Sequence, residues 1–151
     1  SDVAPFMGLG THFGLILVYL GGSIGFNSWL IKGFMDTISP SLDEAAKVDG
    51  ASEFQIFSKI IAPLARPILI VIFVITFIGI YSDFILAAIF LKDKNLWTVA
   101  VGINTVFIDD FNADWGVIAA SSVIAATPIA ALFIFFQKQI TGGLTAGSVK
   151  G

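Results

Sequence analysis

The stretch FGLILVYLGGSIGFNSWLI, residues 13–31, contains no charged side chain. An α-helix rises about 1.5 Å per residue, so about 20 apolar residues are needed to cross the roughly 30 Å hydrocarbon core of a bilayer. Two more stretches have this length and character, 67–91 with the single charge of Asp83 and 115–137 with none. Buried helices of soluble domains are rarely this apolar on every face. The sequence therefore predicts an all-α membrane protein with three transmembrane helices.

Composition narrows the class further. Hydrophobic residues make up 56% of the 151-residue chain and charged residues 13%, whereas a soluble domain carries roughly 25% charged residues. The net charge of −3 and the lack of a basic run argue against a nucleic-acid partner. With no cysteine and the single histidine His12, we expect no disulfide framework and no metal site. Residues 1–5 lack an initiator Met and a positive n-region, so we interpret them as a chain that begins mid-protein.

The basic residues are unevenly shared among the connections. The segment between the first two stretches and the C-terminal tail hold six of them, and the segment between the second and third stretches holds two, beside four aspartates. The six are Lys32, Lys47, Lys59, Arg66, Lys138 and Lys150, and the two are Lys92 and Lys94. Cytoplasmic connections carry the excess of Lys and Arg, so residues 39–66 and the C-terminus are predicted to be cytoplasmic. The chain is thus expected in the cell (inner) membrane as a multi-pass protein.

Small residues on two of the stretches predict close helix packing. Gly21 and Gly25 form a G-x-x-x-G pair, and the stretch 115–137 is rich in Ala and Ser. Three helices alone make a thin bundle, so further helices are expected from a missing N-terminal part or from a partner. His12 and the three tryptophans lie near the ends of the stretches, where side chains of this kind are expected at the membrane interface.

The connection SPSLDEAAKVDGASEFQIFSKIIAPLARP, residues 39–67, indicates two short helices with a tight corner. Ser41 is predicted to cap the first helix, with Glu44 completing a capping box. Gly50 stands where a left-handed residue ends a helix, and Ser52 with Gln55 repeats the capping box for the second helix. An apolar stripe in the second helix recurs at spacings of three and four, formed by Phe54, Phe57, Ile61 and Leu64. We expect it to lie on the chain's own spans, on the bilayer surface or on a partner.

Part of this connection resembles the EAA loop of binding-protein-dependent ABC permeases. The residues that keep the family's spacing are Glu44, Ala45, Ala46, Gly50, Ile60 and Pro63. Ala62 stands where the family has Leu, a mild departure because a small apolar residue remains. The stretches similar to sugar-importing members are Asp49–Ser52, Tyr81–Phe84 and Thr98–Gly102.

The ends of the chain narrow the resemblance to the smaller permease subunits of maltose and maltodextrin importers. The matching segments are Tyr19–Gly22, Ile31–Phe34 and Gly143–Gly151. The likeness covers essentially the whole chain. It implies that the chain corresponds to the C-terminal half of such a permease, which has about six spans in its core.

The resemblance implies a division of labour among several proteins. The EAA segment would form a coupling helix that docks on a dimer of cytoplasmic ATPase subunits. A second homologous permease would complete the pathway, and an extracytoplasmic binding protein would deliver the sugar. ATP and Mg²⁺ would bind to the ATPase, because this sequence has no Gly-x4-Gly-Lys-Ser/Thr phosphate loop. The chain itself is expected to be no enzyme, to hold no cofactor, and to contact membrane lipid.

The resemblance also assigns residues to these contacts. Coupling to the ATPase falls on Glu44, Ala45, Ala46, Asp49, Gly50, Ala51, Phe57, Ile60 and Pro63. A second ATPase contact falls on the tail residues Gly143, Leu144, Thr145, Ala146 and Gly147. The contact with the sugar-loaded binding protein falls on Asp109, Asp110, Phe111 and Asn112, although a merely solvated loop would have the same composition.

Asp83 leaves two roles open. A carboxylate at the bilayer centre costs about 2.5–3.5 kcal/mol on insertion scales, so Asp83 is a candidate for the translocation pathway. It would instead serve structural pairing if it lay nearer the outer interface, where a break in the helix would expose it to water. Asn27 is likewise either a helix-to-helix hydrogen-bonding group or a pathway residue. The rival functions are a secondary transporter that uses Asp83 as an ion site, an ABC importer of another solute, and a membrane anchor without transport.

Overall fold

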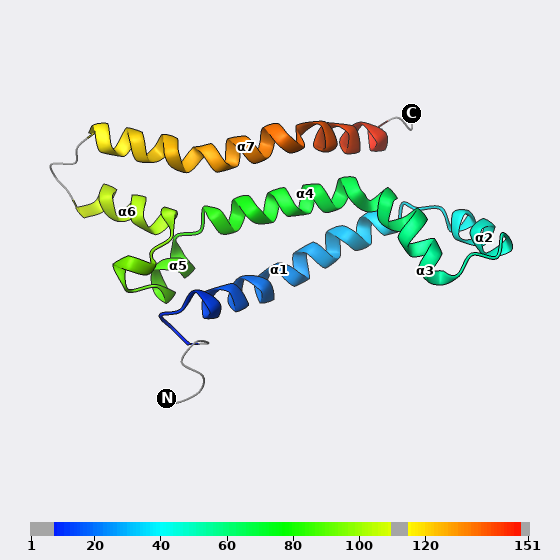
Figure 1. Cartoon of the computed structure of the whole chain (residues 1–151), viewed down its shortest axis with the longest axis horizontal. Helices are drawn as coiled ribbons and strands as arrows, with labels where there is room; N and C mark the ends of the chain where they lie inside the picture. The colour runs from blue at the N-terminus through cyan, green and yellow to red at the C-terminus, as the bar shows by residue number, and fades with distance from the viewer. Residues whose placement is uncertain (1–7, 110–114, 149–151) are drawn as a thin grey trace. The chain divides into compact units, whose positions relative to one another are not determined.

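In this computed structural model, residues 8–109 and 115–148 are described, and every regular element among them is a helix. The elements in chain order (Figure 1) are α1 (His12–Met35), α2 (Pro40–Val48), α3 (Glu53–Ile56), the π-helical turn η1 (Phe57–Ile61), α4 (Ala62–Tyr81), α5 (Ile85–Phe90), the 3-10 helix η2 (Lys94–Leu96), α6 (Val99–Asp109) and α7 (Trp115–Ser148). The predicted all-α class is confirmed.

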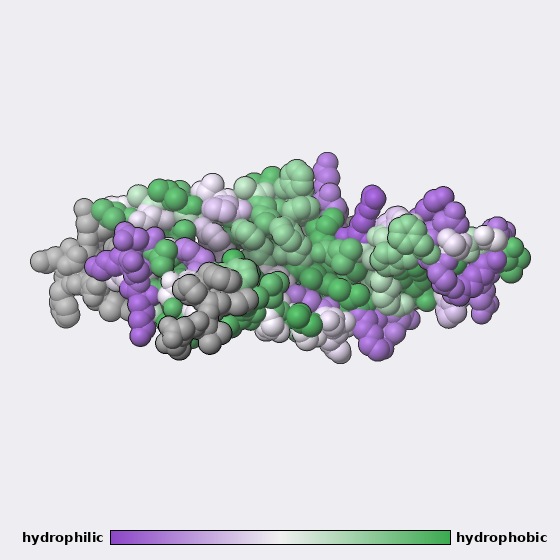
Figure 2. Space-filling model, turned by 60° about the horizontal axis from the view of Figure 1, so that its bottom comes forward, coloured by the Kyte–Doolittle hydropathy of each residue, from purple (hydrophilic) through white to green (hydrophobic). Residues whose placement is uncertain are grey.

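Three helices are long and apolar enough to cross a membrane, namely His12–Met35, Glu53–Tyr81 and Trp115–Gln139. The prediction of three transmembrane helices is therefore confirmed. At most 11% of the most apolar window of each helix is buried, so their apolar faces point outward, as in proteins surrounded by lipid or further helices. Figure 2 shows hydrophobic residues over the long helices and hydrophilic residues gathered over α2 and α3.

The second predicted span, 67–91, differs from the observed helix at both ends. Helix α4 ends at Tyr81, and a break at 82–84 separates it from α5. The break is stable because the Asp83 side chain accepts hydrogen bonds from backbone N–H groups at the start of α5. Toward the N-terminus the helix extends back to Glu53, so the second helix of the corner is not short but continues into α4. The predicted stretch 67–91 is therefore not one continuous helix, since its last part lies beyond the break and the helix that carries its first part begins earlier, at Glu53.

The π-helical turn η1 explains how the helix passes the start of α4. Pro63 has no N–H, so a regular α-helix would leave the Lys59 carbonyl without its partner. In η1 the Ala62 N–H bonds instead to the Phe57 carbonyl, five residues back, and the register changes immediately before the proline. The sequence shows the proline but not the change of register.

By its internal contacts, the chain divides into two units, residues 1–24 with 75–134 and residues 25–74 with 135–151. Helices α1, α4 and α7 each contribute to both. The first unit has a hydrophobic core of Leu15, Ala87, Leu91 and Val101. Ala87 and Leu91 belong to the end of the predicted second stretch, and Val101 to the segment that the sequence indicated only as a connection, so the region from α5 to α6 supplies three of these four residues.

Two long-range hydrogen bonds tie the start of α1 to this segment. The Gly10 N–H donates to the Phe90 carbonyl at 2.7 Å, and the His12 Nε2 lies 2.9 Å from the Leu96 carbonyl oxygen. Trp97 packs against the core, and Lys94 Nζ lies 5.7 Å from the centroid of its ring. His12 and Trp97 thus have contacts inside the fold beyond the interfacial placement that the sequence predicted.

Gly21 and Gly25 of the first span stay uncovered. A Cβ added at Gly21 or Gly25 would have nothing within 4 Å among the described residues. The close packing predicted from the G-x-x-x-G pair is therefore not made within the described part of the chain.

Candidate functional site

The corner, which we define as residues 39–66, turns at Gly50. Helix α2 ends at Val48 with Asp49 as its C-cap, and Gly50 follows with a φ of 79°, the left-handed conformation that the sequence predicted. The Gly50 N–H donates to the Lys47 carbonyl at 3.0 Å and the Ala51 N–H to the Ala46 carbonyl at 3.0 Å. This pair of bonds is the Schellman motif, which satisfies the last carbonyls of α2 and fixes the direction of the chain that follows.

The second helix of the corner begins with the predicted capping box. The Gln55 N–H donates to Ser52 Oγ at 3.3 Å, and the Ser52 N–H donates to Gln55 Oε1 at 2.9 Å. Both ends of the turn are therefore held by bonds between residues at most five positions apart.

The predicted cap of the first helix is wrong. The N-cap of α2 is Ser39, and its side chain makes no cap hydrogen bond. Ser41 lies inside α2, with its Oγ 2.7 Å from the Ser39 Oγ, so it forms no capping box with Glu44. The reason is Pro40, whose fixed φ and missing N–H favour the first helical position and so move the start of the helix two residues earlier.

Lys47 joins the two helices of the corner. Its Nζ lies 2.8 Å from Asp43 Oδ2 on α2 and 3.1 Å from Glu53 Oε1 on α3. Hydrogen bonds to Asp43 and then to Glu53, with the attraction of both charges, raise the pKa of Lys47 above its ordinary value. The angle between α2 and α3 thus has a side-chain brace beside the backbone turn.

Large apolar side chains of the corner face outward. The exposed fractions are 88% for Val48, 77% for Phe54 and 57% for Phe57, while Ala46 and Ile56 are buried. The remaining residues that the resemblance assigned to coupling are exposed (Glu44, Ala45, Asp49, Gly50, Pro63) or half-buried (Ala51, Ile60). The corner is a braced turn that presents apolar groups among charged ones, a surface suited to docking in a groove of a partner.

In the first unit, one carboxylate oxygen of Asp83 accepts three hydrogen bonds. Its Oδ2 accepts from the Tyr19 hydroxyl at 2.7 Å and from the backbone N–H groups of Leu86 at 3.1 Å and Ala87 at 3.3 Å. These bonds connect α1 to the start of α5, as structural pairing requires. Tyr19 is 64 residues away in sequence, and no sequence pattern indicated it as the partner. The other candidate, Asn27, is half-buried in α1 and belongs to the second unit.

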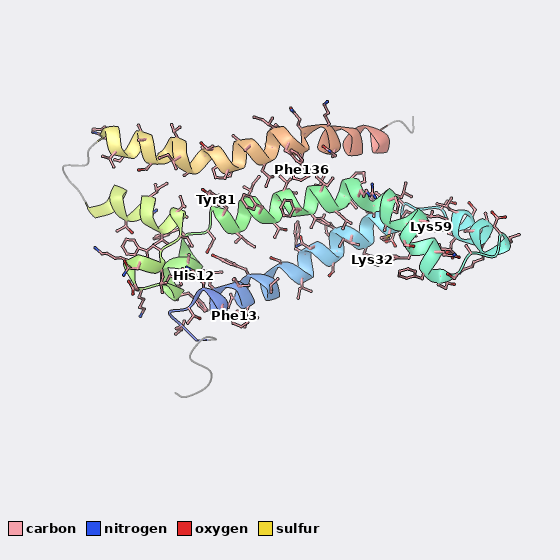
Figure 3. The ribbon with its side chains drawn as sticks, in the orientation of Figure 1. His12, Phe13, Lys32, Lys59, Tyr81 and Phe136 are labelled. Carbon is pink, nitrogen blue, oxygen red and sulfur yellow. The ribbon has the colours of Figure 1, made fainter. Side chains whose placement is uncertain are left out.

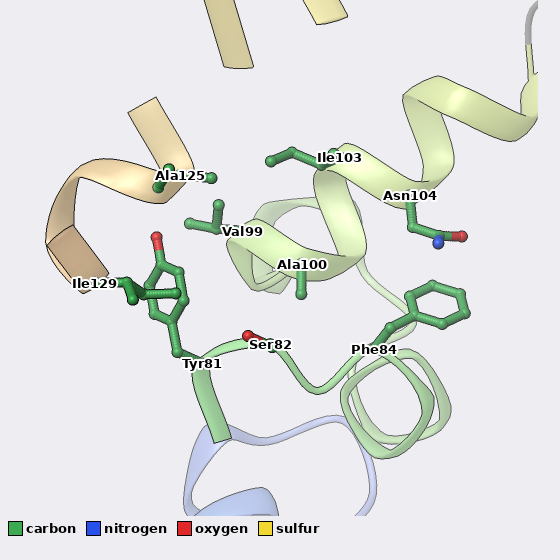
Figure 4. Close-up of a pocket in the computed structure, with 10 residues that line it drawn as sticks. Tyr81, Ser82, Phe84, Val99, Ala100, Ile103, Asn104, Ala125 and Ile129 are labelled. Carbon is green, nitrogen blue, oxygen red and sulfur yellow. The ribbon is translucent and has the colours of Figure 1, made fainter. Parts of the chain in front are cut away.

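A cavity of about 390 Å³ lies beside the break (Figure 4). Its lining residues are Tyr81, Ser82 and Phe84 at the break, Val99, Ala100, Ile103 and Asn104 on α6, and Ala125, Ala126 and Ile129 on α7. Asn104 Oδ1 is shielded from solvent and accepts no hydrogen bond from the described residues. Sequence reasoning missed Asn104, although it is a polar residue within an otherwise largely apolar helix.

The two remaining sets of predicted contact residues fall at the limits of the described chain. Asp109 is the last residue of α6, and Asp110, Phe111 and Asn112 lie outside the described residues. The tail residues 143–147 lie within α7, which continues to Ser148, and their side chains are outside the described set. Neither prediction of a partner contact is tested.

Comparison with known proteins gives one family and a consistent set of relatives. The family described as "Binding-protein-dependent transport system inner membrane component" matches residues 6–144. The maltose/maltodextrin transport system permease protein MalG of Photorhabdus laumondii is 44% identical over the whole chain and 50% of its own length. Proteins with the same name match from Vibrio vulnificus (46%, over 97% of the chain and 49% of the relative) and Escherichia coli K12 (44%, over 100% and 50%). The chain spans about half the length of the curated relatives it matches.

Proposed function

The chain belongs to the family of binding-protein-dependent transport system inner membrane components, and from this premise we propose that it is half of a permease subunit in an ATP-driven sugar importer. Relatives at 44% and 46% identity are named as maltose/maltodextrin permeases, so maltose, a maltodextrin or a related disaccharide is the proposed solute. With three helices able to cross a bilayer, this member of an inner-membrane family is a multi-pass membrane protein. An importer of another solute is the alternative within the family.

The proposed importer needs partners that supply the chemistry. A dimer of cytoplasmic ATPase subunits would bind ATP and Mg²⁺, a second homologous permease would complete the pathway, and an extracytoplasmic binding protein would deliver the sugar. The chain itself would catalyse no reaction and hold no cofactor. Membership of a binding-protein-dependent family supports this arrangement and argues against a secondary transporter that uses Asp83 as an ion site or an anchor without transport.

The corner is the proposed point of coupling to the ATPase. The observation that carries this proposal is a turn held rigid at Gly50, Ser52 and Lys47, with Val48, Phe54 and Phe57 exposed on it. A rigid contact transmits a movement because packed interfaces switch between discrete arrangements. The excess of basic residues at this end of the spans supports a cytoplasmic position for the corner and the C-terminus.

The roles proposed for Asp83, the tail and residues 109–112 rest on other observations. Asp83 is proposed to serve structural pairing with Tyr19, because all three of its hydrogen bonds stay within the first unit. The tail 143–147 is proposed as a second ATPase contact and residues 109–112 as the contact with the binding protein, both on the resemblance alone.

Substitution of Gly50 tests the coupling proposal. A Cβ at this position meets nothing within 4 Å, so the cost of Gly50→Val is backbone strain, roughly 1–2 kcal/mol for a left-handed residue. In the full-length permease assembled with its partners, we expect normal abundance in the membrane but a sharp fall in sugar uptake and in binding-protein-stimulated ATP hydrolysis. Gly50→Asn is the matched control, because Asn adopts left-handed backbone readily and should keep most activity. Full uptake by the valine variant at normal abundance would show that the corner is an ordinary loop.

A further inference from the structure

A groove lies in the other unit, the one that does not contain the cavity described above. Its lining residues are Arg66, Leu69, Ile70 and Phe73 on α4 and Phe136 on α7, and its volume is about 370 Å³. The four α4 residues stand at positions i, i+3, i+4 and i+7, so they form one stripe along the helix. At 1.5 Å per residue the stripe runs about 10.5 Å along the axis, with the cation at one end and an aromatic ring at the other.

The groove is apolar along its length and open on one side. The Phe73 and Phe136 rings meet edge to face, with centroids 6.0 Å apart and an interplanar angle of 70°. Leu69 and Phe73 are nevertheless 44% and 51% exposed. The contact between the two rings therefore closes one side of the groove between α4 and α7. On its open side the groove exposes an apolar surface to the surroundings of the helices.

Arg66 gives the groove a polar end. Its side chain is exposed, and among the described residues no carboxylate pairs with it. It is also the last charge before the uncharged run from Pro67 to Ser82. A basic residue at such a boundary keeps its charge at the level of the lipid headgroups while its aliphatic part lies along apolar surface.

We infer that this groove binds an anionic phospholipid, with Arg66 on the phosphate and one acyl chain along Leu69, Ile70 and Phe73. The guanidinium group fits a phosphate through two parallel hydrogen bonds, and basic pockets between membrane helices are known to take anionic headgroups. A free anion would use Arg66 but leave the apolar stripe without a role. A helix of a partner would cover the stripe but would have to bring a carboxylate to the same end to pair with the guanidinium group. A phospholipid satisfies both ends of the groove.

The test uses the full-length permease in its complex, purified in detergent and given either phosphatidylglycerol or phosphatidylcholine with the same acyl chains. Lipid retained by the complex is counted by native mass spectrometry. We expect the unchanged protein to prefer phosphatidylglycerol and Arg66→Gln to lose that preference by about fivefold, the factor that one basic residue near an anionic surface supplies. Arg66→Lys should keep most of it.

Two controls separate the groove from general surface charge. Lys59→Gln removes an equal charge two turns earlier on an exposed residue that does not line the groove, and should leave the preference nearly unchanged. Phe73→Ala should lower retention of both lipids. Equal preference in Arg66→Gln and the unchanged protein, or an equal loss in Lys59→Gln, would overturn the inference. So would competition by soluble glycerol phosphate as strong as that by the lipid, because the site would then recognise an anion only.

Discussion

The chain turns between helices both in the corner at 39–66 and in the break region at 81–109, but different contacts hold the two regions. The corner is fixed by bonds between near neighbours, such as the capping box of Ser52 and Gln55. The break region is held by hydrogen bonds between residues far apart in the sequence. The Tyr19–Asp83 bond spans 64 residues, and the bond between His12 (labelled in Figure 3) and the Leu96 carbonyl spans 84. The corner leaves Val48, Phe54 and Phe57 exposed, whereas Ala87 and Leu91 in the break region are fully buried.

The corner therefore behaves as an exposed surface, and the break region as part of a folded core. Local bonds make the corner rigid without covering it, so its apolar groups are available to a partner. Long-range contacts make the break region depend on α1, so its integrity reports the folding of the whole first unit. The four predictions that follow challenge this contrast, from the largest expected effect to the smallest.

Leu91→Ala should have the largest effect on stability. Leu91 is fully buried in the core of the first unit, so truncation removes apolar contacts and leaves a cavity, at a cost of about 2–5 kcal/mol. Thermal unfolding of the purified complex measures the loss. Leu86→Ala makes the same chemical change five residues earlier, within α5, at a residue that is 37% exposed, and should cost much less. Equal losses from the two variants would mean that the break region has no specific core.

Tyr19→Phe should come next. It removes the hydroxyl that donates to Asp83 and leaves that carboxyl with its two backbone donors, for a loss of about 1.5–3 kcal/mol, typical of a hydrogen bond to a charged group. The melting temperature of the complex is the readout. Tyr81→Phe is the matched control, because the Tyr81 hydroxyl makes no hydrogen bond to a described residue. If both changes lower stability alike, the bond between α1 and α5 is not what matters.

Ser52→Ala should have a local effect of about 1 kcal/mol, the usual cost of removing an N-cap side chain. Hydrogen exchange at the Gln55 amide should accelerate while thermal unfolding of the complex stays nearly unchanged. Ser41→Ala should change neither, since Ser41 lies inside α2 and caps nothing. Faster exchange in Ser41→Ala would indicate that Ser41 does cap α2, as the sequence alone suggested.

The smallest effect belongs to Lys47. Its pKa is raised by Asp43 and Glu53, so the brace stabilises the corner fully below the ordinary pKa of 10.5 and is lost as the pH rises through the raised value. Because the ammonium group is exposed, salt should screen the brace. Exchange rates at the α3 amides should therefore rise with salt at neutral pH, and Lys47→Gln should abolish that salt dependence. If the salt dependence persists in the variant, it comes from charges other than Lys47.

The contrast between the regions also explains what the sequence could predict. Gly50, Ser52 and Gln55 were identified correctly because their partners lie within a few residues. Asp83 was singled out as costly in a membrane, and a break in the helix was one of the two interpretations, but its partner Tyr19 could not be found. Asn104 and helix α6 were missed, and α5 was predicted as the end of the second span, because each piece of that segment is apolar yet too short to show a clear period.

The sequence by itself determined the all-α class, the three apolar spans and the turn at Gly50, because span length, charge distribution and left-handed backbone are local properties. Only the tertiary structure decided that the second helix stops at Tyr81 and that Asp83 pairs with Tyr19. These features depend on which distant group meets which. The tertiary structure brings such groups together, and no spacing along the chain encodes their meeting.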